Sequence, residues 1–539
     1  MRVGIISVYT DYNRAGRHHR GVLQPQIGPL IAALLPPGVD VDIVNDTWDD
    51  PDWNRDYDLL FLSCLHSDFD RARQISHYWR RRGAKTVLGG TMASTYTRLC
   101  RPYFDAVAVG DPEATVPIIV DDFGRGQLKP VYVAPPFDPR GVPTPRLDLV
   151  ARKQILPLAV EATRGCPFTC EFCALTGIGT RYHPRPANSV AVEIAAGQRA
   201  LEGLVPWWRR HIAIFYDNNL GGNPTYLRGL CDALAPLGIR WGACVTFNVI
   251  CDPQNLKALA KGGCRCVFVG LESFNPETLR HMGKHQNVLA RTRAAVDLCH
   301  DHGILVMAGL MLSPTTDGID YIDSIPERLR DSGLHVPTYV CFETPFPGTP
   351  HFKQLAASGA GAFLPNALLR DFNGYTLAVP PRHASTGDFI AAYKRLWKTV
   401  YSRRVRLAKF LEDLPCFARG AHLVPVLFDL YELFSEDAAL NEARNFIAGL
   451  DVEPPEAHAV PLAQCDFESE QDYERIMRPW RVTDESGRAL PMWDQAQALY
   501  GSKGHVIATV RGFVAAGVAS QEDATGVAAL AACGEGAEL

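Results

Sequence analysis

The fold class predicted from this sequence is α/β, with a doubly wound parallel sheet first, a partial barrel second and a mainly helical part last. Two observations predict it. Short segments rich in Val, Ile and Leu alternate with helical patterns over residues 1–135, and a second series of this kind follows a proline-rich stretch. Such alternation is typical of parallel sheets covered by helices. The second series holds six units, which favours a partial (β/α)6 barrel over the complete barrel of eight.

The first part is predicted to contain strands that are short, apolar and closed by polar or glycine residues. These strands are expected at residues 2–8, 41–44, 58–63, 85–88 and 105–109. Helical patterns occupy residues 24–35 and 68–82. Ligands of parallel sheets bind at the carboxyl ends of the strands, so functional residues are expected there.

The second part is predicted to begin after a linker at residues 136–154, where prolines interrupt every regular pattern. Its strands are expected at residues 156–162, 211–216, 241–245, 266–270, 304–311 and 338–342, and its helices at 189–204, 224–237, 287–302 and 324–332. The domains are therefore expected at residues 1–135, 155–380 and 381–515, with a flexible tail at 516–539. In the third domain, Ser385, Thr386 or Asp388 is expected to cap a helix whose apolar face begins at Phe389.

Composition excludes several classes of protein. The chain of 539 residues is 47% hydrophobic and 21% charged, which excludes a mostly disordered, collagen-like or coiled-coil protein. Its 54 basic and 59 acidic residues leave a net charge of −5, so nucleic acid is not expected as a partner. No apolar run approaches the length of a transmembrane helix, and the start of the chain resembles a buried strand rather than a signal peptide. A cytoplasmic location is expected.

Three of the fifteen cysteines lie within eight residues of one another, at Cys166, Cys170 and Cys173. They directly follow a predicted strand, which places them at the carboxyl end of the first barrel strand, where barrel chemistry occurs. Thiolates bind iron–sulfur clusters, and three cysteines would leave one iron of a four-iron cluster open. A structural zinc site with His183 as fourth ligand is an alternative, although zinc sites favour paired ligands at both ends of a loop. Three unrelated thiols are the other alternative.

The spacing C-x3-C-x2-C, with the aromatic Phe172 before the last cysteine, resembles the signature of the radical S-adenosylmethionine (SAM) superfamily. The resemblance implies that Cys166, Cys170 and Cys173 hold a 4Fe–4S cluster and that SAM chelates the open iron. It further implies that an electron from the cluster cleaves SAM to a 5′-deoxyadenosyl radical. Phe172, Asp217, Glu272 and Ser273 are then expected near the cluster or SAM. The stretches 282–287 and 343–350 are similar to the branch of this superfamily that also uses cobalamin.

The first 135 residues resemble the flavodoxin-like cobalamin-binding domain of that branch. Its motifs at strand ends have counterparts in Ser63, Leu65, Gly89, Gly90 and Gly110, which the resemblance assigns to cobalamin binding. Glycine suits such a place because the backbone can approach the cofactor closely where no Cβ intervenes. The family's first motif contains a histidine ligand to cobalt, whereas this chain has Asn13 at that position. The resemblance therefore predicts cobalt without a histidine below it, and His18 and His19, which follow closely, are the alternative ligands.

The paired resemblance implies a methyltransferase that methylates an unactivated carbon of a small molecule through methylcobalamin and the 5′-deoxyadenosyl radical. The expected substrate is a natural-product intermediate, a polyprenoid or a tetrapyrrole, and the expected electron donor is a flavodoxin or ferredoxin. Three alternatives remain. The first is a cobalamin-containing cyclase or oxidoreductase without methyl transfer, and the second is a radical SAM enzyme whose first domain is an empty relic. The third is a non-catalytic cobalamin or iron–sulfur sensor.

Overall fold

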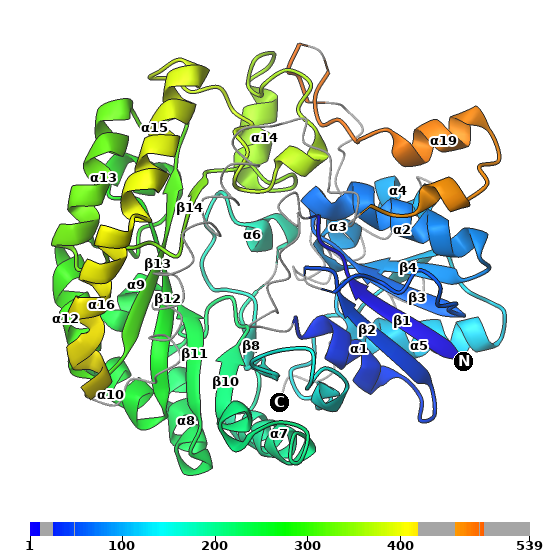
Figure 1. Cartoon of the computed structure of the whole chain (residues 1–539), viewed down its shortest axis with the longest axis horizontal. Helices are drawn as coiled ribbons and strands as arrows, with labels where there is room; N and C mark the ends of the chain where they lie inside the picture. The colour runs from blue at the N-terminus through cyan, green and yellow to red at the C-terminus, as the bar shows by residue number, and fades with distance from the viewer. Residues whose placement is uncertain (11–24, 48, 180, 419–458, 485, 490–539) are drawn as a thin grey trace, which may run out of the picture.

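Two six-stranded parallel sheets form the framework of the protein (Figure 1). The computed structural model describes the chain except for residues 11–24, 48, 180, 419–458, 485 and 490–539. Asn13 and the expected tail therefore lie outside the described residues. No helix in the described part is long and apolar enough to cross a membrane.

The first sheet has the strand order β2-β1-β3-β4-β5-β6. Its strands are β1 (Arg2–Ser7), β2 (Asp40–Asn45), β3 (Leu59–Ser63), β4 (Lys85–Gly89), β5 (Ala106–Val109) and β6 (Val131–Val133). The order 2-1-3-4-5 is that of flavodoxin-like sheets, with one strand added at the edge. The five predicted strands are all present. The sixth, β6, lies at the expected domain boundary and was not predicted, because three residues beside several prolines carry no readable pattern.

Both faces of this sheet are covered, because successive residues of a strand point to opposite sides. In β3, Leu59 and Phe61 join a core with α1 (Ile27–Leu34) and α5 (Pro112–Gly124). Leu60 and Leu62 join a second core with α2 (Phe69–Arg81) and α3 (Gly90–Thr95). The doubly wound arrangement predicted from the sequence is therefore present.

The second sheet has the order β14-β13-β12-β11-β10-β7, and all its pairings are parallel. Its strands are β7 (Leu158–Val160), β10 (Ile212–Phe215), β11 (Arg240–Val245), β12 (Cys264–Glu272), β13 (Leu305–Leu312) and β14 (Tyr339–Phe342). They form an open half-barrel, as predicted. The helices that pack into its core are α7 (Ala187–Ala200), α8 (Pro224–Leu234), α10 (Pro253–Lys261), α12 (Thr292–Asp301) and α13 (Ile319–Asp331).

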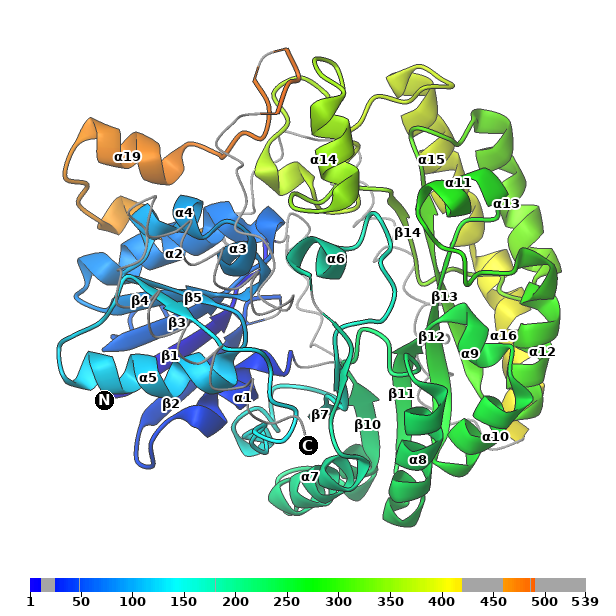
Figure 2. The ribbon, with the colours of Figure 1, turned by 180° about the vertical axis from the view of Figure 1, so that it is seen from behind.

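Helix α15 (Thr386–Val400) and residues 459–484, which follow the half-barrel in the chain, pack against different sheets. Helix α15 is capped by Ser385, which accepts a hydrogen bond from the Asp388 amide, and its buried face belongs to the half-barrel core. Residues 459–484, with α19 (Glu470–Met477), pack instead on the first sheet, and Figure 2 shows α19 above α2 and α4 (Thr97–Cys100). The domain limits expected from the sequence remain predictions.

Candidate functional site

The three cysteines lie on one loop at the carboxyl edge of the half-barrel. The loop runs from β8 (Thr163–Arg164) to α6 (Ala174–Ile178). Beyond α6, β9 (His183–Pro184) returns to pair with β8 in a small antiparallel ladder. Cys170 is buried, Cys166 and Cys173 are half-buried, and all three are free thiols. The structure thus places them where the sequence predicts.

Burial favours the protonated form of two of these thiols, Cys170 and Cys173, in the metal-free chain. Burial raises the pKa of Cys173 to about 11 and also raises the pKa of Cys170, although the nearby Lys284 ammonium opposes the rise at Cys170. A bound metal deprotonates its thiol ligands outright. Cys170 and Cys173 are therefore poorly suited to act as free nucleophiles.

A single zinc ion fits this loop less well than a four-iron cluster. Thiolates bind zinc at about 2.3 Å, so two of them on one ion lie less than about 4.6 Å apart. Within the described residues, the three thiols are not among the groups whose ligand atoms converge within 4.8 Å. The alternative fourth ligand, His183, packs edge-on against Phe137 with ring centroids 5.9 Å apart.

Asp217 lies beneath the cysteine loop and binds the chain that leads into it. This carboxylate directly follows Tyr216 at the end of β10 and is buried. It accepts hydrogen bonds from the Ala162 amide at 3.1 Å, from the Thr163 amide, and from the Thr163 hydroxyl at 2.6 Å. Burial raises its pKa to about 7 in spite of these donors. Asp217 therefore positions the start of the loop.

Glu272 and Lys284 form a buried ion pair beside the loop. The Lys284 ammonium lies 2.5 Å from a Glu272 carboxylate oxygen and 5.7 Å from the centre of the Phe172 ring. Glu272 ends β12 with φ +64°, a left-handed conformation that side chains other than glycine adopt at a cost of about 1 kcal/mol or more. Two of the predicted residues, Phe172 and Glu272, are thus brought together by a lysine that the prediction did not assign.

Ser273 is hydrogen-bonded to residues of the turn after β12 and to Tyr321 rather than to the cysteine loop. It is fully buried, its Oγ lies 2.7 Å from the Tyr321 hydroxyl, and it accepts a hydrogen bond from the Asn275 amide at 3.0 Å. These contacts fix the turn after β12. The predicted role of Ser273 toward SAM remains a prediction.

Two residues near the loop were missed by sequence reasoning. Asn219 is fully buried, and its amide nitrogen lies 3.6 Å from the Cys166 sulfur. Arg164, two residues before Cys166, forms ion pairs with three carboxylates at 2.7, 3.0 and 2.5 Å: Asp111, Glu113 and Glu161. The only signal in the sequence for Arg164 was its place beside the cysteines.

The Arg164 cluster connects the two sheets. Asp111 and Glu113 begin α5, directly after Gly110 at the end of β5, whereas Arg164 and Glu161 lead into the cysteine loop. Because the guanidinium is mostly buried, its three partners offset the cost of removing the charge from water. The carboxyl edges of the two sheets are thereby joined.

The carboxyl edge of the first sheet is built mainly from backbone. Ser63 and Gly89 are paired at the ends of β3 and β4, and Gly90 follows with φ +87°. A Cβ on Gly90 would lie 2.8 Å from the Ser63 hydroxyl and 3.1 Å from the carbonyl oxygen of Cys64. Leu65 exposes 57% of its surface at this edge. Gly110, with φ +92°, donates its amide to the Ser94 hydroxyl at 3.1 Å.

The two edges meet at α3 and α6, which lie side by side in Figures 1 and 2. Gly348 lies between them. A Cβ on Gly177 of α6 would lie 3.0 Å from the Gly348 backbone, and a Cβ on Gly348 would lie 2.8 Å from the methyl group of Thr95 in α3. The cysteine loop and the glycine-rich edge are therefore neighbours.

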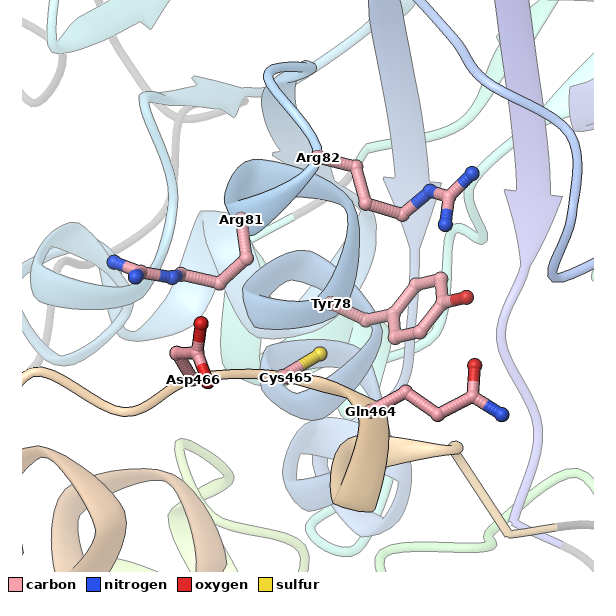
Figure 3. A pocket seen from close by; sticks show the side chains of 6 residues that line it. All are labelled: Tyr78, Arg81, Arg82, Gln464, Cys465 and Asp466. Carbon is pink, nitrogen blue, oxygen red and sulfur yellow. The ribbon is translucent and has the colours of Figure 1, made fainter.

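A small surface pocket lies apart from this region (Figure 3). It has a volume of about 170 Å³ and is lined by α2 and the segment 464–466, with Arg81 and Asp466 on one side and Tyr78 and Arg82 on the other. It contains none of the predicted site residues, so we assign it no part in the cofactor site.

Comparison with known proteins agrees with the geometry. The profile of the Radical SAM superfamily matches residues 160–325. The bacteriochlorophyllide d C-8(2)-methyltransferase of Chlorobaculum tepidum is 25% identical over 346 residues, which cover 61% of this chain and 75% of that protein. The hopanoid C-2 methylase of Rhodopseudomonas palustris is 26% identical over 353 residues, covering 62% and 65%.

A solved structure extends the likeness to almost the whole chain. The cobalamin-dependent S-adenosylmethionine radical enzyme OxsB, determined with aqua-cobalamin and SAM bound, aligns with a TM-score of 0.54. The alignment covers 99% of this chain and 84% of that one at 12% sequence identity. At this identity, the likeness is evidence of a shared fold.

Proposed function

We propose that this chain, which matches the Radical SAM superfamily over residues 160–325, is a cobalamin-dependent enzyme that methylates an unactivated carbon of a small molecule. The reaction would use a 4Fe–4S cluster and SAM at the half-barrel edge and cobalamin at the edge of the first sheet. When bound, the cluster with SAM supplies a radical that removes a hydrogen atom from the substrate, and cobalamin carries the methyl group.

The observation that carries this proposal is the meeting of the two edges at α3, Gly348 and α6. A substrate carbon activated at one cofactor must reach the other without diffusing away, because effective reaction needs the reacting atoms held close together. Sites on opposite ends of the two sheets would not permit this. Here one substrate cavity would serve both.

The residues present fit both groups. Cys166, Cys170 and Cys173 would hold the cluster, and Asp217 would keep their loop in place. At the other edge, Gly89 leaves the end of β4 open, since a Cβ there would meet only the Leu62 carbonyl oxygen at 3.9 Å. Gly90 lets the next turn pack closely against Ser63 and Cys64, and Leu65 offers an exposed apolar surface there. Ser63 and Gly89 complete this cradle. Asn13, outside the described residues, stays the predicted neighbour of cobalt.

The substrate class follows from the relatives, which are named for tetrapyrrole and hopanoid methylation. We propose a rigid, largely apolar small molecule of one of these kinds. A reduced flavodoxin or ferredoxin would supply the electron. The enzymatic relatives disfavour the sensor alternative.

The first measurement is the iron and cobalt content of protein that has been purified under strictly anaerobic conditions with added cobalamin. About four irons and one cobalt per chain are expected. The protein is then incubated with SAM, reductant and a panel of tetrapyrroles and hopanoids. Methyl transfer requires both S-adenosylhomocysteine and 5′-deoxyadenosine to form with a methylated product. Four irons without cobalt would contradict the cobalamin assignment, and 5′-deoxyadenosine without S-adenosylhomocysteine would favour the cyclase or oxidoreductase.

A further inference from the structure

Two histidines and a glutamate converge behind the cysteine loop, on elements that are distant in sequence. His281 ends α11 (Pro276–His281), Glu343 directly follows β14, and His351 lies in the first turn of α14 (Pro350–Ala357). Figure 2 labels the three elements. One ligand atom from each residue lies within 4.8 Å of the other two.

The distances suit one shared metal ion better than direct hydrogen bonds. A Glu343 carboxylate oxygen, Oε1, lies 3.1 Å from His351 Nδ1 and 3.7 Å from His281 Nε2. Two ligands bound at about 2.1 Å to one tetrahedral ion lie about 3.4 Å apart. The observed separations lie on either side of that value.

The burial of Glu343 is a second argument for a metal ion at this place. Its side chain is completely buried, and Oε1 accepts no hydrogen bond from the part of the chain that the structure describes, although the His351 imidazole lies 3.1 Å away. A buried carboxylate oxygen without a donor is costly and calls for a partner. The other oxygen, Oε2, accepts a hydrogen bond of 2.5 Å from the Ser313 hydroxyl. A hydrogen bond to the outer oxygen is how proteins orient a carboxylate ligand to a metal.

The segments that carry His281 and His351 also form hydrogen bonds with the cysteine loop. The Glu171 amide donates to the carbonyl of Met282, the residue after His281, at 3.2 Å. The His351 amide donates to the Glu171 carbonyl at 3.1 Å. The peptide groups of Glu171, between Cys170 and Cys173, are thus held by the same two segments that supply the histidines.

We propose that His281, Glu343 and His351 bind a divalent metal ion, zinc by the chemistry of the ligands, which clamps the cysteine loop against α11 and α14. Two imidazoles and one carboxylate form a known zinc ligand set that leaves a fourth position open. His281 is the accessible ligand, with 34% of its side chain exposed, so this side provides the entry path. The ion is separate from the iron–sulfur cluster, and the proposal does not depend on methyl transfer.

The experiment measures zinc and iron in the same sample of cluster-loaded, full-length protein after one equivalent of zinc is added and loose metal is removed by a weak chelator. About one zinc per chain is expected in the wild type, and less than about a tenth in H281Q. H211Q is the matched control, because His211 is a histidine on the short helix before β10, outside this cluster. It should retain zinc. Absence of zinc from the wild type, or retention of zinc in H281Q, would overturn the proposal.

Two further measurements keep the test independent of folding and activity. H281D replaces the imidazole ligand by a carboxylate ligand and should bind zinc again, unlike H281Q. If substitution at this position only damaged the fold, H281D would not regain zinc binding. Hydrogen exchange of residues 165–179 should slow at least about threefold when zinc is added to the wild type but not when it is added to H281Q. Equal exchange with and without zinc would overturn the clamping role. None of these readouts changes if the methyltransferase assignment fails.

Discussion

The two facing edges of this molecule are built in opposite ways. At the half-barrel edge, charged and sulfur-bearing side chains crowd together, as with the buried Glu272–Lys284 pair, and Arg164 joins this edge to Asp111 and Glu113 of the first sheet. At the edge of the first sheet, the prominent features are glycine backbone at Gly89 and Gly90 and one exposed leucine, Leu65. The half-barrel edge positions groups by electrostatics, whereas at the edge of the first sheet Gly89 leaves the end of β4 open.

This contrast indicates two kinds of cofactor. A cluster that SAM approaches needs thiol ligands and fixed charges, which must be paired when they are buried. A large planar cofactor needs an uncovered surface, which only small residues provide. The edges should therefore respond differently to substitution, and the following predictions test that difference.

The largest effect is expected at the cysteine loop. Cys170→Ala removes one of three thiols, so iron content should fall to near zero and SAM cleavage should become undetectable, while cobalt content stays near one per chain. The matched control is Cys465→Ala, which changes a half-buried thiol outside the cysteine loop. Iron and cobalt analysis of both variants checks this. Loss of cobalt from the Cys170 variant would show that the two edges do not act separately.

A substitution at the edge of the first sheet should give the converse result. Gly90→Ala places a Cβ 2.8 Å from the Ser63 hydroxyl, so cobalt content should fall at least about tenfold while iron stays near four. Gly38→Ala controls for backbone strain, because Gly38 has a similar φ of +82° and nothing within 4 Å of its Cβ position. Both variants bear a comparable strain cost of about 1–2 kcal/mol. Equal cobalt loss in both would remove the steric explanation.

A smaller effect is expected from Lys284→Met. The change leaves the buried Glu272 carboxylate without its cation and removes a positive charge from beside the cysteine loop. We expect SAM cleavage to slow about 10–100-fold, as is usual when outer-shell partners of a metal site are lost. Lys261→Met is the control, because its pair with Asp232 is exposed and contributes little. A rate equal to that of the control would contradict the electrostatic role.

The smallest effect concerns pH. Because burial raises the pKa of Asp217 from about 4 to about 7, the folded protein binds more protons than the unfolded chain between these values. The free energy of unfolding should therefore fall as pH rises from 4 to 7, by at most about 1.4 kcal/mol per pH unit from this group, and should level off above 7.

Asp217→Asn should be less stable, since its amide nitrogen would face a donor, and should show a shallower slope. Urea unfolding of the cluster-free chain at several pH values measures both. Asp232→Asn, an exposed carboxylate, should leave the slope unchanged. An unchanged slope in the Asp217 variant would mean that the carboxyl is ionised throughout.

Much of the framework could be predicted because it depends on local pattern. The strands of both sheets appeared as short apolar runs, and the helix cap was narrowed to Ser385, Thr386 or Asp388, of which the structure selects Ser385. The cysteine spacing was likewise local, since a loop of eight residues holds all its ligands. The strand β6 escaped notice because its three residues are stabilised by pairing with β5 rather than by any pattern of their own.

The side-chain partnerships could not be predicted, because they join residues far apart in the chain. Asp217 binds Ala162 and Thr163, Arg164 reaches back to Asp111, and the proposed metal ligands come from 281, 343 and 351. The periodicity of a segment reports which of its faces is buried, and the spacing of a motif reports a ligand set within one loop. Neither reports which carboxylate meets which cation across two sheets, because that depends on how the folded elements pack, and packing appears only in three dimensions.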